Sequence, residues 1–141
     1  MELNKKLSQI QAKLKAKKSK FNSFGKYNYR SAEDILEALK PYLIEHDVTV
    51  VINESIEEQA GLLIMNSVAT ISDGNAEIQA VALVAVDMEQ RGMNAPQKFG
   101  SASSYGKKYA LGNLFLIDDT ADSDATNKHG KEAKPKLEGA A

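Results

Sequence analysis

The sequence predicts an α+β fold in which a three-stranded antiparallel β-meander packs against helices. Three segments that suit strands, 48–53, 62–71 and 76–86, follow one another along the chain. The Asp73-Gly74 pair predicts a hairpin between the second and third segments, and residues 57–61 predict the turn between the first two. Segments with helical periodicity lie on both sides of the strands and would cover the sheet.

Two helices are predicted before the strands. In residues 3–18, Leu3, Leu7, Ile10 and Leu14 recur at helical spacing among lysines, which predicts an amphipathic basic helix. Its narrow apolar stripe suits the chain's own core and a partner subunit equally well. A second helix should begin after Ser31, because Asp34 completes a capping box with it. The buried side is expected to comprise Ile35, Leu36, Leu39, Tyr42 and Leu43, and Pro41 predicts a kink or break near Lys40.

Length and composition predict one domain with a tail. We expect a basic N-terminal helix over residues 1–20, a core domain over 21–126 and a disordered tail over 127–141 of the 141 residues. The absence of cysteine excludes disulfides, thiol catalysis and thiolate metal sites, and is typical of a reducing cytoplasm. The sequence contains neither an apolar run of membrane-spanning length nor a secretory signal, so a cytoplasmic protein without a membrane partner is expected.

The net charge of −1 hides a strong segregation of charge along the chain. Residues 1–30 carry nine Lys or Arg and one acid, whereas residues 31–90 carry one lysine and twelve acids. Residues 91–117 again carry four basic residues and no acid. Two basic blocks of this kind could hold a polyanion, and the acidic middle could meet a basic neighbour such as another copy of the chain.

The most informative segment is 97–111, which reads as a helix with two unlike faces. Gln97, Ser101, Ser104 and Lys108 fall within one narrow arc. The opposite arc should pack on the core and contains Phe99, Ala102, Gly106, Tyr109 and Ala110. Hydroxyls and ammonium groups on one rigid surface suit contact with a phosphate backbone.

The order of residues in this segment resembles the essential recombination function (ERF) family of phage single-strand annealing proteins. The matching positions are Gln97, Gly100, Ser101, Ala102, Ser104, Tyr105, Lys107, Lys108, Tyr109, Ala110 and Leu111, followed by acidic residues from Asp118 to Asp124. Upstream, Lys26, Tyr27 and Tyr29 resemble the segment before the family's first long helix. The family often has arginine where Lys107 and Lys108 stand, so phosphate contact here would lack the bidentate fork.

This resemblance implies a fold like that of the phage and eukaryotic Rad-type annealing proteins, assembled in rings or filaments. It implies ATP-independent binding of single-stranded DNA and annealing of complementary strands in phage homologous recombination and DNA repair, within the bacterial host cytoplasm. Beyond other copies of the chain, a phage exonuclease and a single-strand binding protein are suggested as partners. No enzymatic activity, cofactor or metal is expected. The implied DNA-binding residues are Lys26, Tyr27, Tyr29, Arg30, Gln97, Lys98, Ser101, Ser104, Tyr105, Lys107 and Lys108.

The individual roles follow from side-chain chemistry and leave some alternatives open. The lysines and serines of the helix would hold phosphates, and Gln97 would bond the DNA backbone or fix the helix start. Tyr27, Tyr29 or Tyr105 would support bases by stacking. Aromatics beside basic residues in 21–30 suit such stacking, but the same tyrosines could instead be half-buried core residues.

Other functions fit the sequence less well. A phosphate-binding P-loop does not fit, because five residues separate Gly100 from Gly106 and Lys108 follows Lys107. The aspartates of 118–124 lack the pattern of a calcium loop, although a metal-dependent nuclease remains an alternative. The two histidines, His46 and His129, read as incidental. The main alternatives are a module that coats single strands without annealing them and an adaptor that binds acidic partners.

Overall fold

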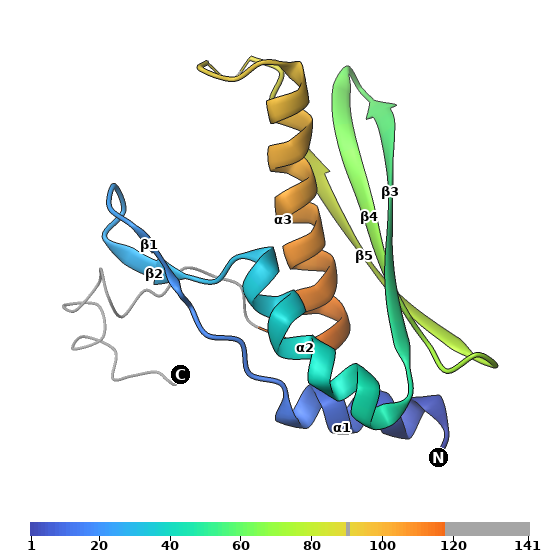
Figure 1. The fold of residues 1–141 in the computed structure, drawn as a ribbon. Coiled ribbons are helices and arrows are strands. Elements are labelled where there is room, and N and C mark those ends of the chain that lie inside the picture. The colour runs from blue at the N-terminus through green and yellow to red at the C-terminus, as the bar shows by residue number, and fades with distance from the viewer. Residues whose placement is uncertain (90, 118–141) are drawn as a thin grey trace, which may run out of the picture.

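The structure is a computed structural model that describes residues 1–89 and 91–117. In chain order the elements are α1 (Leu3–Lys13), β1 (Lys20–Asn22), β2 (Tyr27–Tyr29), α2 (Ala32–His46), β3 (Thr49–Gln59), β4 (Leu62–Ser72), β5 (Glu77–Ala85) and α3 (Ala95–Phe115). Strands β3, β4 and β5 form a three-stranded sheet with helices on one side, and β1 and β2 form a separate two-stranded sheet (Figure 1). This arrangement confirms the predicted α+β class. The acidic run 118–124 and the predicted tail 127–141 lie outside the described residues.

The three-stranded sheet is an antiparallel meander in the order β3-β4-β5, as predicted. Val50 pairs with Ile71, and Val68 pairs with Val81. The turn from β4 to β5 contains the predicted Asp73-Gly74 pair: the Asp73 carboxylate accepts hydrogen bonds from the backbone N–H groups of Asn75 and Ala76 at 2.9 and 2.8 Å. These bonds lower the pKa of Asp73, and Gly74 supplies the positive φ of 95° that the turn requires.

The first hairpin is longer than the sequence suggested. β3 continues to Gln59 and β4 begins at Leu62, so the predicted turn over residues 57–61 narrows to Ala60 and Gly61. Both residues have positive φ, 52° and 83°. A two-residue turn of this hand matches the twist of the flanking strands, and the pairing therefore extends to the very end of the hairpin.

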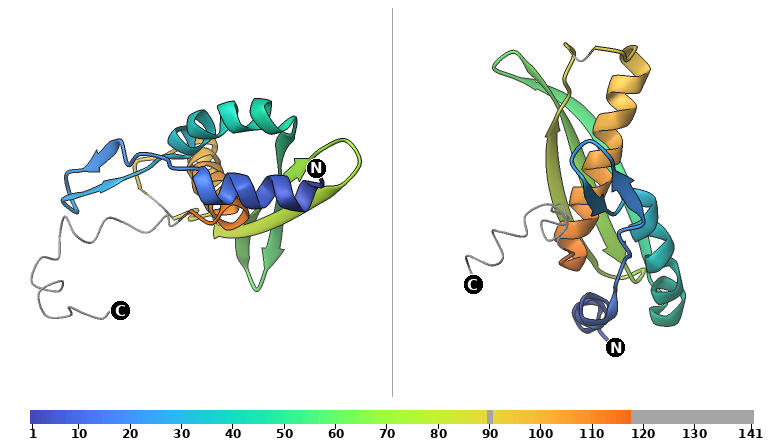
Figure 2. Two further views of the ribbon diagram at one scale, coloured as in Figure 1. Left: turned by 90° about the horizontal axis from the view of Figure 1, so that it is seen from below. Right: turned by 90° about the vertical axis from the view of Figure 1, so that its left-hand side faces the viewer.

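Helix α3 lies between the sheet and the other two helices (Figure 2, right). Ala69 and Ile71 of β4 join Leu111, Leu114 and Phe115 of α3 in one buried core. The opposite side of that part of α3 meets the N-terminal helices, where Gln11 of α1 donates a hydrogen bond to the Leu114 carbonyl oxygen at 2.8 Å. The C-terminal half of α3 is therefore enclosed on both sides, whereas its N-terminal half rests on the sheet alone (Figure 1).

The N-terminal helix is shorter than predicted. It ends at Lys13, and residues 14–19 continue as an extended segment rather than as helix up to residue 18. Leu14 and Ala16 are buried while the lysines between and after them are not, which is the alternation of an extended chain. Lysines at positions 13 and 17 would repel each other in a helix and favour this ending. The predicted apolar stripe packs on the chain's own core.

Helix α2 begins where the sequence predicted, and it continues past Pro41, near which a kink or break was predicted. Ser31 and Asp34 form the capping box, with Ser31 Oγ accepting from the Asp34 N–H at 3.2 Å. The helix continues through Pro41 to His46, so a break near Lys40 is wrong. Ile35 and Leu39 are fully buried, and that packing holds the helix together despite the lost backbone bond. Among the described residues, no helix is both long enough and apolar enough to cross a membrane.

Candidate nucleic-acid interface

The start of α3 is fixed by reciprocal hydrogen bonds. Asn94 Oδ1 accepts from the Gln97 N–H at 2.9 Å, and Gln97 Oε1 accepts from the Asn94 N–H at 2.8 Å. Pro96 lies in the first turn, where its missing N–H costs nothing. Of the two roles predicted for Gln97, the structure therefore shows the one that fixes the helix start.

One face of α3 sits unusually close to β4. Gly106 is buried, and a Cβ atom added there would lie 2.1 Å from Ser67 Oγ. Ser67 and Ser103 both donate hydrogen bonds to the Glu54 carboxylate of β3, at 3.0 and 2.7 Å. This carboxylate therefore links α3 to β3 and β4. Gly106 permits this close packing, whereas a Cβ at Gly100 would meet nothing within 4 Å.

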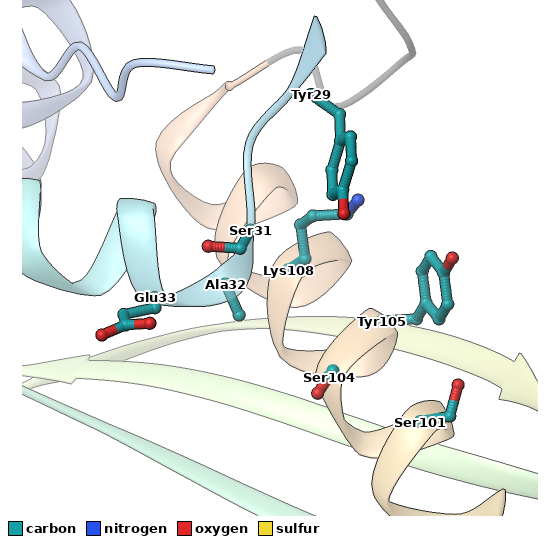
Figure 3. A pocket seen from close by; sticks show the side chains of 8 residues that line it. All are labelled: Tyr29, Ser31, Ala32, Glu33, Ser101, Ser104, Tyr105 and Lys108. Carbon is teal, nitrogen blue, oxygen red and sulfur yellow. The ribbon is translucent and has the colours of Figure 1, made fainter. Parts of the chain in front are cut away.

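The other face of α3 borders an open pocket of about 390 Å³. Figure 3 shows that its lining comes from the end of β2, the start of α2 and the middle of α3. The lining residues are Tyr29, Ser31, Ala32, Glu33, Ser101, Ser104, Tyr105 and Lys108. Five of these were predicted from the sequence as DNA-binding residues, although they lie far apart along the chain.

Lys108 is not the exposed cation that the helical pattern suggested. Only 9% of the residue is exposed. Its ammonium group lies 5.1 Å from the ring centroid of Tyr105 and 5.6 Å from those of Tyr29 and Tyr109. These distances are those of cation–π contacts. Lys108 is buried because β2 brings Tyr29 over this part of α3, a contact that helical periodicity does not reveal.

Four of the five tyrosines gather here: three surround this lysine, and Tyr27 contacts Tyr29. Tyr105 and Tyr109 stack with centroids 6.0 Å apart, and Tyr27 meets Tyr29 edge to face at 6.1 Å. Tyr105 and Tyr109 are 48% and 40% exposed. Tyr109 was expected on the core face of the helix, so its exposed position corrects that expectation.

The aromatic segment 21–30 belongs to a hairpin of two short strands, β1 and β2. β1 pairs with β2, and this small sheet projects from the body on the side away from β3-β4-β5 (Figure 1). Asn22 donates a hydrogen bond to the Tyr27 hydroxyl at 3.1 Å. A Cβ on Gly25 would lie 2.4 Å from the Tyr27 ring, so the absence of a side chain lets the ring fold over the turn.

The basic residues predicted at the interface have different surroundings. Lys26 is exposed at the hairpin turn. Arg30 donates from Nε to the Ala16 carbonyl oxygen at 3.0 Å and so ties the hairpin to the segment after α1. Lys98 Nζ donates to the Met88 carbonyl oxygen at 2.6 Å. Lys107 is half-buried on α3, outside the pocket lining.

The start of α2, which forms one wall of the pocket, is held by Asp34. Its carboxylate accepts from the Ser31 N–H at 2.8 Å and from Ser19 Oγ at 2.7 Å. Burial alone would raise the pKa of Asp34, but the hydrogen bonds from Ser19 and Ser31 together lower it below its usual value. Asp34 therefore links the linker after α1 to the pocket wall.

Sequence reasoning missed the α2 side of the pocket and the role of Tyr109. Ser31 was recognised only as a helix cap, and Glu33 was not singled out. Their proximity to α3 is a tertiary contact without a local sequence signal. Within the described ranges, no group of three or more histidine, aspartate or glutamate side chains could hold a metal ion. The aspartates considered for a nuclease lie beyond those ranges.

Comparison with known proteins shows the family of this chain. A profile of the ERF superfamily matches residues 3–138. The chain belongs to the ERF superfamily. The essential recombination function protein of Salmonella phage P22 is 40% identical over 131 residues. That match covers 93% of this chain and 62% of the relative, so the chain spans less than two thirds of that protein's length. No solved structure matches the chain.

Proposed function

We propose that this ERF-superfamily protein acts in phage recombination by binding single-stranded DNA and annealing complementary strands without ATP. The observation that carries the proposal is the pocket that brings Tyr29 together with Ser101, Ser104 and Tyr105 of α3. It presents aromatic rings for bases and hydroxyls for phosphates on one open surface. The name of the P22 relative, an essential recombination function protein, supports recombination as the process.

In the proposed mechanism, α3 grips the backbone of one strand. Ser101, Ser104 and Lys107 contact phosphate oxygens, and Lys98 exchanges its bond to the Met88 carbonyl oxygen for a phosphate. The tyrosine rings support some bases while others keep their pairing edges free. A second strand can then test complementarity, and duplex formation supplies the driving free energy, so nucleotide hydrolysis is not needed.

Two measurements test this proposal. Binding of a labelled single strand, followed over a series of salt concentrations with the matching duplex as control, should be tight, salt-sensitive and selective for the single strand. Pairing of two labelled complementary oligonucleotides should then accelerate when the protein is added. A protein that binds single strands but leaves pairing unchanged or slower would be a coating module, and annealing would be wrong.

We further propose that copies of the chain assemble, in a ring or a filament. The outer edges of β3 and β5 have no partner strand among the described residues. The sheet face opposite α3 exposes Val51, Val81 and Leu83, which are 53%, 48% and 59% accessible. Open edges and uncovered apolar faces of this kind favour association. Partners implied by the family resemblance, an exonuclease and a single-strand binding protein in the host cytoplasm, belong to the same proposal.

Assembly is tested by light scattering of the purified protein. Wild type should have the mass of several subunits, and Val81→Glu with Leu83→Glu should reduce that mass, because two carboxylates would have to be buried. A wild-type protein that stays monomeric at every accessible concentration would contradict the assembly proposal without affecting DNA binding.

A further inference from the structure

The two adjacent lysines of α3 have unlike surroundings. Lys107 is half-buried and lies outside the pocket, whereas Lys108 is 9% exposed and surrounded by tyrosine rings. Successive helix positions differ by about 100° in direction, so the two ammonium groups face different surroundings. A common role for both lysines, as the sequence alone suggested, does not agree with this arrangement.

We propose that Tyr29, Tyr105 and Tyr109 form a base-stacking platform, which the Lys108 ammonium holds together as a positioning residue rather than as a phosphate contact. This inference rests on the proposed binding of single-stranded DNA. It adds Tyr109 to the interface and assigns nucleobases to the tyrosine side of the pocket, beside the phosphates that Ser101 and Ser104 would contact.

The geometry of the cluster supports the positioning role. The three rings come from two distant parts of the chain, and the ammonium lies within 5.1–5.6 Å of all three centroids. An ammonium at this distance attracts each ring through its negative face. Lys108 therefore brings the β2 tyrosine and the α3 tyrosines to a common centre.

The exposure of the rings and the size of the pocket suit a base on its tyrosine side. Tyr105 and Tyr109 expose nearly half of their surfaces, so their rings are accessible to a ligand, and they already stack with each other at 6.0 Å. A volume of about 390 Å³ can take a group the size of a nucleoside.

The salt dependence of binding distinguishes the two roles. A side chain that neutralises a phosphate contributes about 0.7 to the slope of log affinity against log salt concentration for single strands. A residue that positions aromatic rings contributes affinity without contributing to the slope. We therefore compare Lys108→Met with Lys107→Gln, a matched removal of one charge from the neighbouring position of the same helix.

The chain supplies its own optical probe, because it contains five tyrosines and no tryptophan. Three of the five form the platform and Tyr27 contacts Tyr29, so the tyrosine fluorescence of the protein reports mainly on the platform and its immediate neighbour. Stacking of bases on these rings should quench that fluorescence when an unlabelled oligothymidylate is added. Affinity is measured in parallel with a labelled oligothymidylate at several salt concentrations.

We expect Lys107→Gln to reduce the magnitude of the salt slope by about 0.7 and to leave the quenching of tyrosine fluorescence unchanged. Lys108→Met should lower affinity about tenfold or more at every salt concentration, keep the wild-type slope and weaken the quenching, as expected for loss of one stacked base. Lys108→Arg should restore affinity, because a guanidinium also binds aromatic faces. If Lys108→Met does not fold, Tyr105→Leu takes its place and should likewise keep the slope while reducing the quenching.

Two results would overturn the inference while leaving the proposed function intact. One is a slope for Lys108→Met that falls as far as that of Lys107→Gln with full quenching, which would make Lys108 a phosphate contact. The other is wild-type binding of the strand without any tyrosine quenching. A wild-type protein that binds no single strand even at low salt would instead contradict the proposed function itself.

Discussion

Gly106 sets the distance between α3 and the sheet, and hence the position of every residue on the opposite face of that helix. A Cβ there would meet Ser67 Oγ at 2.1 Å and Ser67 Cβ at 3.1 Å, and Ser67 is fully buried. Because Ser67 also bonds Glu54, it cannot move aside without breaking that hydrogen bond.

Gly106→Ala should therefore destabilise the fold by about 1–3 kcal/mol, the usual cost of overpacking a tight site. Gly100→Ala is the matched control, because its Cβ would meet nothing within 4 Å. At that position alanine should stabilise the helix by up to about 1 kcal/mol. Urea unfolding of the two variants measures both effects. Equal effects of the same sign would contradict the close contact between α3 and β4.

Asp34 carries the pH dependence of the pocket wall. Its pKa in the folded protein is lower than its ordinary value of 3.8, so its carboxylate contributes stability that is fully present above that value. This contribution is lost as the pH falls below 3.8 through the folded-state pKa. The hydrogen bonds to Ser31 and Ser19 are the physical source of the effect.

Asp34→Ala should cost about 1 kcal/mol at neutral pH, as is typical for loss of a helix cap interaction. The difference in unfolding free energy between wild type and variant should stay constant above about pH 5 and shrink as the pH falls below about 4. Unfolding curves at several pH values measure it. A difference that does not change with pH would show that the carboxylate charge plays no part in the cap.

At the scale of elements, the turn between β3 and β4 contains a strained residue. Ala60 has a φ of 52°, in the left-handed region that disfavours residues with a Cβ, and Gly61 follows it at 83°. Asparagine adopts this conformation more readily, and Asn-Gly is a preferred pair in two-residue turns of this hand.

Ala60→Asn should therefore raise the unfolding free energy by about 0.5–1 kcal/mol and leave the sheet pairing intact. Ala12→Asn is a useful comparison, because the exposed Ala12 lies in the helical region, where alanine is favoured. That change should be destabilising. Thermal unfolding measures the stability of both variants. A loss of stability in Ala60→Asn would argue against the two-residue turn.

The elements that sequence reasoning predicted well have local signals. The Ser31 and Asp34 cap, the Asp73-Gly74 hairpin and the existence of three strands each follow from neighbouring residues. The end of α1 at Lys13 and the continuation of α2 through Pro41 depend on burial of Leu14, Ile35 and Leu39. Local periodicity predicted that these side chains are apolar contacts, but it does not show that the tertiary packing of Ile35 and Leu39 outweighs the backbone bond lost at Pro41.

One side of the candidate site could be predicted from the sequence and the other could not. The α3 side of the pocket, with Ser101, Ser104 and Tyr105, follows from helical periodicity and from the family resemblance. The α2 side, and the burial of Lys108 among tyrosines, depend on where the β1–β2 hairpin folds back over α3. Helical spacing placed Lys108 in the correct arc, but only the folded chain shows what fills the space in front of it.

For the whole molecule, the open sheet and the pocket lie on opposite sides of α3. β4 packs against one side of the helix through Gly106, while β2 and the start of α2 border the other (Figures 1 and 3). The proposed subunit contacts through the outer sheet face would therefore leave the proposed DNA surface accessible. Assembly and strand binding can accordingly be disrupted by separate substitutions.

Single-strand binding by the double variant Ser101→Glu with Ser104→Glu tests the proposed DNA surface of α3 most directly. Both serines line the pocket, and Ser104 is exposed while Ser101 is half-buried, so the variant should fold. Lys108 is left unchanged because it is buried. Thr49→Glu with Asn75→Glu is the matched control: both residues are exposed, neither lines the pocket, and the added charge is the same.

At low salt, we expect the labelled single strand to bind wild type and the control variant but not the pocket variant, since two carboxylates would repel the phosphates. Circular dichroism should show that all three proteins are folded. A folded pocket variant that binds the strand as tightly as wild type does would contradict the claim that this face of α3 is the DNA surface.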